Sequence, residues 1–250
     1  MAYGERPWDN PINWSFRIGR LFGIDVRVHI AFILCAAVLL AMEMPKPGSG
    51  VSRSFGEVFV DAFGTYGLLF FIVLVHEFGH CFGARAVGGE ADEILLWPLG
   101  GLATTDPPHN ARAYFLTAAA GPAVNVIFCV LTATVLIFWT GRSAAVPLNP
   151  FHPFRPIDSE LFFSLTAAQF WAVRFFGLSY LLLLFNLLPI LPLDGGQMLQ
   201  SVLWSARGYR KSMEIATATG MVGAIVVGVV ALFIEESWLL LMIAVFGYLT

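Results

Sequence analysis

The stretch "LLFFIVLVHEFGHCFGARAVGG", Leu68 to Gly89, decides the class of fold. Its first half is apolar enough to lie in a lipid bilayer, whereas its second half carries two histidines and a glutamate. A membrane-spanning helix needs about 20 predominantly apolar residues, and ionisable groups at that depth are costly and usually functional. The stretch therefore predicts a membrane helix with a functional site in one half.

The composition of the whole chain supports a membrane protein. Of its 250 residues, 58% are hydrophobic and only 12% are charged, whereas soluble domains have about 25% charged residues. The net charge of −3 and the lack of any run of Lys or Arg argue against a nucleic-acid partner. The three cysteines all lie in apolar stretches, which favours small buried hydrophobic residues over disulfides or a sulfur-rich metal site.

Five apolar runs, and a sixth that is too short to span a bilayer comfortably, predict the helices. They are Val28–Met44, Ala62–Val87, Ala113–Thr140, Phe175–Leu193, Ile215–Ile234 and the short run Trp238–Thr250. We therefore expect an all-α membrane protein, a polytopic bundle of about six transmembrane helices in a single domain over residues 1–250. The short last run leaves open whether a C-terminal domain follows in a longer protein.

Two segments between the helices have the pattern of strands. Residues 23–29, "GIDVRVH", alternate apolar and polar side chains with a period of two, and they end the N-terminal segment 1–27. Residues 90–106 place two short apolar segments around Pro98 to Gly101, which predicts a β-hairpin beside the membrane. The Pro-rich segment Val146–Asp158 cannot form a regular helix.

The distribution of Lys and Arg predicts the orientation in the membrane. With the N-terminus in the cytoplasm, that side receives nine basic residues, which are Arg6, Arg17, Arg20, Arg27, Arg85, Arg112, Arg207, Arg210 and Lys211. The opposite side receives four, which are Lys46, Arg53, Arg142 and Arg155. We therefore expect a multi-pass protein of the cell membrane whose N-terminus and site-bearing end face the cytoplasm.

His76 and His80 are four residues apart, so on an α-helix they project from one face, one turn apart. Two imidazoles at this spacing can bind a single Zn²⁺, and a glutamate directly after the first histidine can act as a general base. Glu77 has that position. The alternative is a polar cluster that packs helices or carries protons. Gly79 and Gly83 would let a second helix approach closely and supply a third ligand.

Asp194 is the candidate for the third ligand. It ends the segment "NLLPILPLDGG", Asn186 to Gly196, in which prolines and glycines break the helix, and irregular backbone at membrane depth must line a cavity or be buried in protein. The predicted orientation places Asp194 at the depth of His76 and His80. The alternative is that Asp194 caps a helix that begins near Gln197. The remaining histidines, His29, His109 and His152, have positions typical of surface or interfacial residues.

Three motifs in this order resemble the site-2 protease family of intramembrane zinc metalloproteases. They are "HEFGH" in one membrane helix, "GPAVN" (Gly121 to Asn125) in the next, and "NLLPILPLDGG" at the end of another. The resemblance covers the chain from about Gly23 onward and implies one Zn²⁺ on His76, His80 and Asp194, with Glu77 as the catalytic residue. It also implies that Asn186 and Asn125 lie near the site. Without a PDZ-like insertion, the chain resembles the minimal-core type.

This family cleaves membrane-spanning segments of other proteins, so the implied partners are a membrane-protein substrate and the lipid bilayer. We expect Glu77 to take a proton from the attacking water, and Asn186 to help zinc stabilise the oxyanion. The hairpin at Gly100 and Gly101 would pair with the extended substrate. A metal-ion transporter is the main alternative, although the ionisable residues of the predicted helices cluster at one depth. A relative that binds membrane segments without cutting them would be expected to lack Glu77 or a ligand. The substrate and the oligomeric state stay open.

Overall fold

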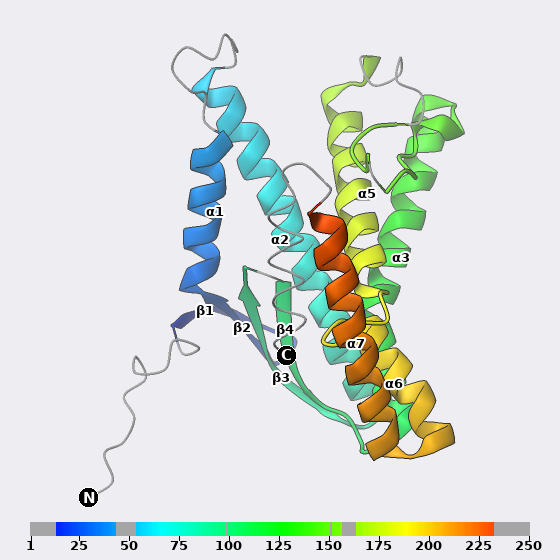
Figure 1. Ribbon diagram of the computed structural model, residues 1–250. Coiled ribbons are helices and arrows are strands. Elements are labelled where there is room, and N and C mark those ends of the chain that lie inside the picture. Colours follow the sequence, from blue (N-terminus) through cyan, green and yellow to red (C-terminus); the bar gives the residue numbers. More distant parts are fainter. Residues whose placement is uncertain (1–13, 44–53, 99, 151, 157–163, 233–250) are drawn as a thin grey trace, which may run out of the picture.

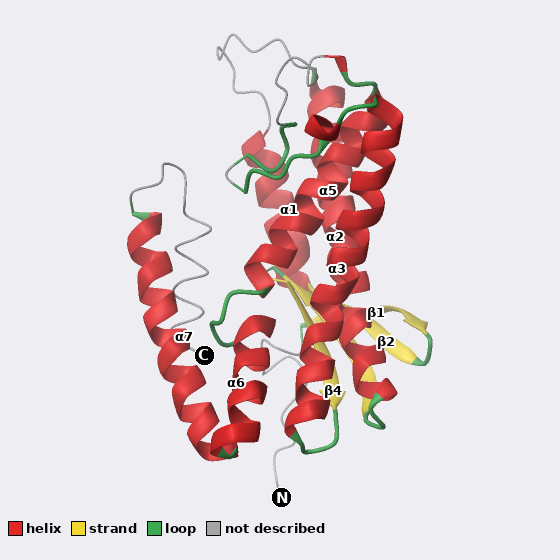
Figure 2. Ribbon diagram, turned by 90° about the vertical axis from the view of Figure 1, so that its right-hand side faces the viewer, coloured by secondary structure: helices red, strands yellow, loops and turns green. Residues whose placement is uncertain are grey.

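The computed structural model describes residues 14–43, 54–98, 100–150, 152–156 and 164–232. Helices make up most of it, and a small sheet lies at one end of the helical bundle (Figure 1). The helices are α1 (Ile30–Glu43), α2 (Phe55–Ala86), α3 (Ala111–Thr140), α5 (Ala167–Asn186), α6 (Asp194–Arg207) and α7 (Tyr209–Ala231), with a short 3-10 helix, η2 (Ser143–Ala145). The turn between α6 and α7 lies at the same end of the bundle as the sheet (Figures 1 and 2).

Four of the described helices, α2, α3, α5 and α7, are long and apolar enough to cross a membrane. The first predicted run forms only the shorter apolar helix α1. The expected class, a polytopic helical membrane protein with a small sheet, is confirmed. The sixth predicted run, Trp238–Thr250, lies outside the described residues.

Several predicted helix boundaries are wrong. The fifth run, predicted to begin at Ile215, belongs to a helix that begins at Tyr209. The fourth run, predicted as Phe175–Leu193, is a helix that begins at Ala167, where a capping box between Thr166 and Gln169 starts it. This helix ends at Asn186, before Pro189 and Pro192. The second helix begins at Phe55 rather than Ala62, again at a capping box. In all three helices, polar residues in the first turns hide the start of the helix from a search for apolar runs.

The sheet has four strands in the order β1-β2-β3-β4, with β1 (Ser15–Leu21), β2 (Ile24–His29), β3 (Glu90–Trp97) and β4 (Gly100–Asp106). Strands β1 and β2 are antiparallel, β2 and β3 are parallel, and β3 and β4 form the predicted antiparallel hairpin. The sequence pattern did not reveal β1, whose apolar side chains are largely exposed. Strand β4 forms one edge of the sheet.

One face of the sheet packs on the second half of α2. Buried apolar residues of β2 and β3 form a common core with α2, which includes Ile24, Val26, Val28, Ile94, Leu96, Val73, Phe78 and Cys81. Arg85, near the end of α2, donates hydrogen bonds to the carbonyls of Phe22 at 2.7 Å and Ala91 at 2.6 Å. The second half of α2 and the sheet are thus held together by apolar packing at the centre and by the hydrogen bonds of Arg85 at the rim.

An ion pair between α2 and α5 lies in the first half of α2, far from the half on which the sheet packs. Arg174 Nη2 is 3.1 Å from Asp61 Oδ1, and Arg174 Nη1 donates to Thr65 Oγ1 at 2.7 Å. The expectation that ionisable residues of the helices lie at one depth is therefore wrong, because Asp61 precedes His76 by roughly 22 Å along the helix axis at about 1.5 Å per residue. The two opposite charges offset each other's cost of burial, and Arg174 also lies over the ring of Phe170.

Candidate metal centre

His76 and His80 lie on one buried face of α2, as their spacing predicts. Their Nε2 atoms are 3.1 Å apart. Gly121 of α3 faces them so closely that a Cβ at this position would collide with both rings. The glycine of the "GPAVN" motif thus keeps the space in front of the two imidazoles open.

Asp194 meets the two histidines from the start of α6. Its Oδ2 is 3.1 Å from His76 Nε2, and its Oδ1 is 3.3 Å from His80 Nε2. The N-cap of α6 is Leu193, so Asp194 lies inside the first turn and does not cap a helix near Gln197.

The segment before Asp194 folds back tightly on the first turn of α6. Gly195 lies against the carbonyls of Leu187 and Leu188, and Gly196 lies against the backbone at Ile190, so a Cβ at either position would collide with main chain. Two glycines are therefore required where the broken end of α5 turns into α6. This fold-back places the carboxylate beside α2 although 118 positions separate it from His76.

Each histidine is oriented by a second contact on its other ring nitrogen. His76 Nδ1 is 2.7 Å from Asn125 Oδ1, and His80 Nδ1 is 2.8 Å from the carbonyl oxygen of Thr117. Since both partners are acceptors, each neutral imidazole carries its proton on Nδ1 and presents the lone pair of Nε2. Metal-binding histidines commonly have this arrangement.

Three electron-pair donors therefore converge on one point, namely two Nε2 atoms and a carboxylate. All three ligand atoms lie within 4.8 Å of one another. Donors around a tetrahedral Zn²⁺ at about 2.0–2.1 Å are separated by about 3.3 Å, which matches the distances between these atoms. Convergent lone pairs repel one another unless a cation lies between them, so the donor set fits a zinc ion with three protein ligands.

Glu77 lies beside this cluster without belonging to it. Its Oε2 accepts a hydrogen bond from the backbone N–H of Ala103 in β4 at 3.1 Å. Its carboxylate lies directly against Gly101, where a Cβ would collide with it. The edge of β4 thus holds a buried carboxylate next to the cluster of His76, His80 and Asp194.

All four of these residues open onto one cavity of about 390 Å³. Its lining includes Gly100 and Gly101 of β4, Asn186 at the end of α5, and Thr117 of α3. Asn125 is fully buried and contacts His76 without lining this cavity. Sequence reasoning missed Thr117 and Ala103, because their contacts with His80 and Glu77 use backbone atoms that any residue type supplies.

The other histidines of the described chain lie outside the metal cluster. His29 ends β2, and its Nδ1 accepts a hydrogen bond from the N–H of Ala31. His109 packs in an aromatic cluster with Tyr114, Trp204 and Tyr209. His29 therefore contributes to the junction of β2 and α1, and His109 contributes to aromatic packing.

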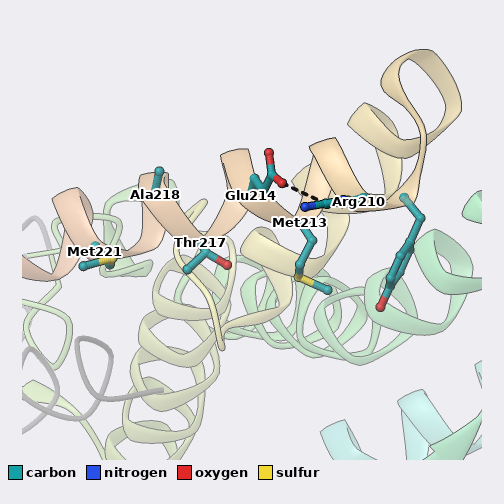
Figure 3. A pocket seen from close by; sticks show the side chains of 7 residues that line it. Arg210, Met213, Glu214, Thr217, Ala218 and Met221 are labelled. Atoms are coloured by element: carbon teal, nitrogen blue, oxygen red, sulfur yellow. Dashed lines mark ion pairs between the residues drawn. The ribbon is translucent and has the colours of Figure 1, made fainter.

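A larger hollow of about 510 Å³ lies on the side of α7 (Figure 3). Its charged residues are Arg210 and Glu214, which form an exposed ion pair at 3.3 Å, one turn apart on the same helix. Among the residues that the structure describes, only His76, His80 and Asp194 form a group able to hold a metal. The candidate metal site therefore lies in the smaller cavity, not in the hollow beside α7.

The fold and this site together define a class of protein, a bundle of membrane-length helices with a buried site able to hold a metal. The model of peptidase family M50 matches residues 65–230. The chain belongs to this family, and the cluster of His76, His80 and Asp194 could hold a metal ion.

Individual relatives agree with this assignment. The chain is 28% identical over 241 residues to a zinc metalloprotease of Methanocaldococcus jannaschii, a match that covers 95% of this chain and 59% of that protein. It is 32% identical over 216 residues to a Synechocystis protein named as a candidate zinc metalloprotease, covering 84% of this chain and 50% of the relative. The chain thus spans between half and three fifths of the length of these curated relatives.

The fold is similar to that of the solved site-2 protease from Methanocaldococcus jannaschii. The TM-score is 0.62 at 26% sequence identity, and the match covers 94% of this chain and 93% of that structure.

Proposed function

We propose that this chain is an intramembrane zinc metalloprotease that hydrolyses peptide bonds within or near transmembrane segments of membrane proteins. The observation that carries the proposal is the convergence of His76, His80 and Asp194 beside the buried carboxylate of Glu77, in one cavity of a membrane-helix bundle. Peptidase family membership supports the hydrolytic chemistry, and the apolar surroundings support a substrate that lies in the membrane.

A zinc ion held by these three residues supplies Lewis acidity, which lets a water molecule lose a proton near neutral pH. In the proposed reaction Glu77 accepts this proton while the water oxygen bonds to the carbonyl carbon of the scissile peptide. Glu77 then gives the proton to the nitrogen of the leaving amine as the carbon–nitrogen bond breaks. The single hydrogen bond from Ala103 orients the carboxylate for both transfers.

Asn186 is proposed to stabilise the oxyanion. It follows the last apolar turns of α5 and lines the cavity with the metal ligands. An amide N–H directed at a developing negative charge in a dry site contributes more than it would in water. Asn125 has a different proposed role, since its amide is engaged by His76 and by the carbonyl of Ser179.

Strand β4 is the proposed docking edge for the substrate. A peptide bond inside a helix keeps its carbonyl in an internal hydrogen bond, so the scissile segment has to become extended. Residues 100–103 and 105 of β4 line the cavity, and β4 pairs only with β3 within the described sheet. An extended segment can therefore add to this edge as a further strand.

The proposed location is the cell membrane, with the metal centre toward the cytoplasm. Arg85, Arg112 and Arg207 lie in the last turn of α2, the first turn of α3 and the last turn of α6, and these helix ends are at the same end of the bundle as the sheet (Figure 1). Arg142 follows the opposite end of α3. This asymmetry supports a cytoplasmic sheet under the positive-inside rule. The N-terminus would lie on the same side because β2 leads directly into α1.

The test is to co-express the chain with candidate single-span membrane proteins and to compare the wild type with Glu77→Gln. We expect cleavage by the wild type, its loss in Glu77→Gln, and one zinc per chain in both proteins. Asp194→Asn is expected to lose both zinc and cleavage. Substantial cleavage by a zinc-loaded Glu77→Gln protein would overturn the assignment of the base. Metal uptake into vesicles that does not depend on Glu77 would favour a transporter instead.

A further inference from the structure

Two glycines from different helices make close contact with the main chain at Leu191. Gly196 lies in the first turn of α6, and Gly220 lies in the middle of α7. A Cβ at Gly196 would be 2.5 Å from the backbone nitrogen of Leu191, and a Cβ at Gly220 would be 3.1 Å from the same atom. An optimal non-bonded contact lies at about 3.5–4.0 Å. Neither contact therefore leaves room for a methyl group.

The segment in contact with these glycines leads directly into the metal ligand Asp194. The N–H of Leu193 donates to the carbonyl of Ile190 at 2.9 Å, which closes a turn around Leu191. Leu193 is also the N-cap of α6, and its own carbonyl accepts from the N–H of Gly196 at 3.0 Å. Because hydrogen bonds join this turn to the first turn of α6, a displacement of Leu191 is passed on to Asp194.

Helix α7 packs on α6 through small side chains, and the two helices lie side by side (Figure 2). Small residues let membrane helices approach closely. A buried hydrogen bond joins the pair, from Nε2 of Gln200 in α6 to the hydroxyl of Ser212 in α7 at 3.1 Å. Bulk added at Gly220 could be relieved by moving α7 away only if this buried bond were broken, which is costly. The buried small residues recur every four positions, and they are Ser212, Ala216, Gly220 and Ala224.

Gly223 makes a second contact of α7 with the same segment. A Cβ at this position would be 2.5 Å from Cγ1 and 2.6 Å from Cδ1 of Ile190. The side chain of Ile190 is branched at Cβ, so its χ1 is stiff and Cγ1 cannot turn away at low cost. Two glycines of α7 thus contact two consecutive residues of the chain that leads to Asp194.

We infer that Gly220 is a positioning residue for the metal ligand Asp194, which it places through the main chain at Leu191. Gly223 has the same role through the side chain of Ile190. No described residue of α7 lines the cavity, so the effect is indirect. A metal ligand has to be held within about 0.5 Å of its productive position, so a small shift of Leu191 weakens the site. The inference rests on the proposed zinc site and extends its support to a helix that supplies no ligand.

The first experiment measures the zinc affinity of Gly220→Ala and Gly220→Val by competition with a chelator of known affinity. Each protein is purified as the full chain in detergent micelles. We expect the affinity to fall by about 10-fold for alanine and about 100-fold for valine, the range found when the support of a metal ligand is removed. The difference in Tm between the zinc-loaded and the zinc-free protein should shrink in parallel. Val222→Leu is the matched control on the same helix, because Val222 is 62% exposed.

The second experiment is a steric rescue. Gly223→Ala should also weaken zinc binding by about 10-fold. Ile190→Ala removes the two atoms that the new methyl group would meet and leaves Cβ of residue 190 at 3.7 Å, an ordinary contact. The double variant should therefore bind zinc as tightly as Ile190→Ala alone. Ile190→Ala should not rescue Gly220→Ala, whose contact is with main chain. This pair of variants tests the inference even if Gly220→Val does not fold.

A general loss of helix packing is distinguished by Gly64→Ala in the first half of α2. A Cβ at this position would collide with the ring of Trp171, away from the metal ligands. We expect Gly64→Ala to lower Tm and to leave the zinc affinity at the wild-type value. Behaviour of this kind in Gly220→Ala and Gly223→Ala would overturn the inference, because α7 would then have only a structural role.

Failure of the rescue would overturn the role of Gly223. Failure of the proposed function gives a different result. The wild type would then hold zinc without cleaving any membrane protein, while the Gly220 variants would still bind zinc more weakly.

Discussion

Asn125 accepts a hydrogen bond from Nδ1 of His76 at 2.7 Å, although the two residues are 49 positions apart. The amide nitrogen of Asn125 in turn donates to the backbone carbonyl of Ser179 in α5 at 3.3 Å. Because that carbonyl can only accept, the amide has one orientation, and it fixes the proton of His76 on Nδ1. Contacts among α2, α3 and α5 thus direct the lone pair of His76 Nε2 toward the metal position.

Asn125→Ala should therefore weaken zinc binding without removing a ligand. We expect a loss of affinity of about 10–100-fold, the usual effect of removing the partner of a metal-binding histidine. Competition with a chelator of known affinity measures it. Thr134→Val is the control on the same helix, and unchanged zinc affinity in Asn125→Ala would contradict the role of this hydrogen bond.

Gly121→Ala should greatly weaken zinc binding by filling the space in front of His76 and His80. The added Cβ would collide with both imidazoles, so at least one ring has to turn away. We expect zinc affinity to fall by about 100-fold, the upper end of the effects seen when the surroundings of metal ligands are changed. Gly67→Ala in α2 is the matched control, since a Cβ there meets nothing. Full metal content in purified Gly121→Ala, measured by atomic emission, would refute the prediction.

Gly101→Ala should leave zinc in place and reduce the rate. Its Cβ would push the Glu77 carboxylate away from the edge of β4, and a misplacement of about 1 Å can cost roughly 10²-fold in rate. We expect kcat to fall while the zinc content stays at the wild-type level. Gly19→Ala in β1 is the control, because its Cβ would have open space. A normal kcat in Gly101→Ala would show that Glu77 does not depend on this contact.

The ion pair between Asp61 and Arg174 should contribute to stability and not to the metal site. Removing Arg174 takes away the ion-pair partner that Asp61 has at 3.1 Å, so Arg174→Met is expected to destabilise the protein by about 3 kcal/mol. The double variant Asp61→Asn with Arg174→Met should be less destabilised than Arg174→Met alone. Unfolding of the three proteins in mixed micelles measures the difference, and zinc content should be the same in all. If the single and double variants unfold alike, the two charges are not coupled.

Much of the site could be predicted from sequence for two reasons. Three of its residues lie close together on one helix, and polar residues and broken backbone are costly within a membrane. His76, Glu77 and His80 share one helix, so their relative positions follow from helix geometry alone. Asp194 could be placed because prolines and glycines mark broken backbone, which is tolerated at membrane depth only where it lines a cavity. The apolar runs predicted the class of fold because backbone groups in lipid must form hydrogen bonds within their own segment, which requires long continuous helices.

Other features required the tertiary structure. Strand β1 was missed because its pattern has no buried face, and the starts of α2 and α5 were missed because capping residues and the paired charges of Asp61 and Arg174 interrupt the apolar pattern. No residue-type pattern could indicate the contact of Ala103 with Glu77 or of Thr117 with His80, because backbone groups make both.

The sequence by itself determined that the chain forms a helical membrane protein with a histidine pair and a carboxylate suited to zinc. The physical reason is the high cost of polar groups in lipid, which makes a few such residues in apolar runs informative. Only the tertiary structure decided which groups complete the site. The fold-back at Gly195 and Gly196, the closeness of α3 at Gly121 and the edge of β4 bring distant segments within hydrogen-bonding distance, and such contacts depend on packing between elements rather than on the pattern within any one of them.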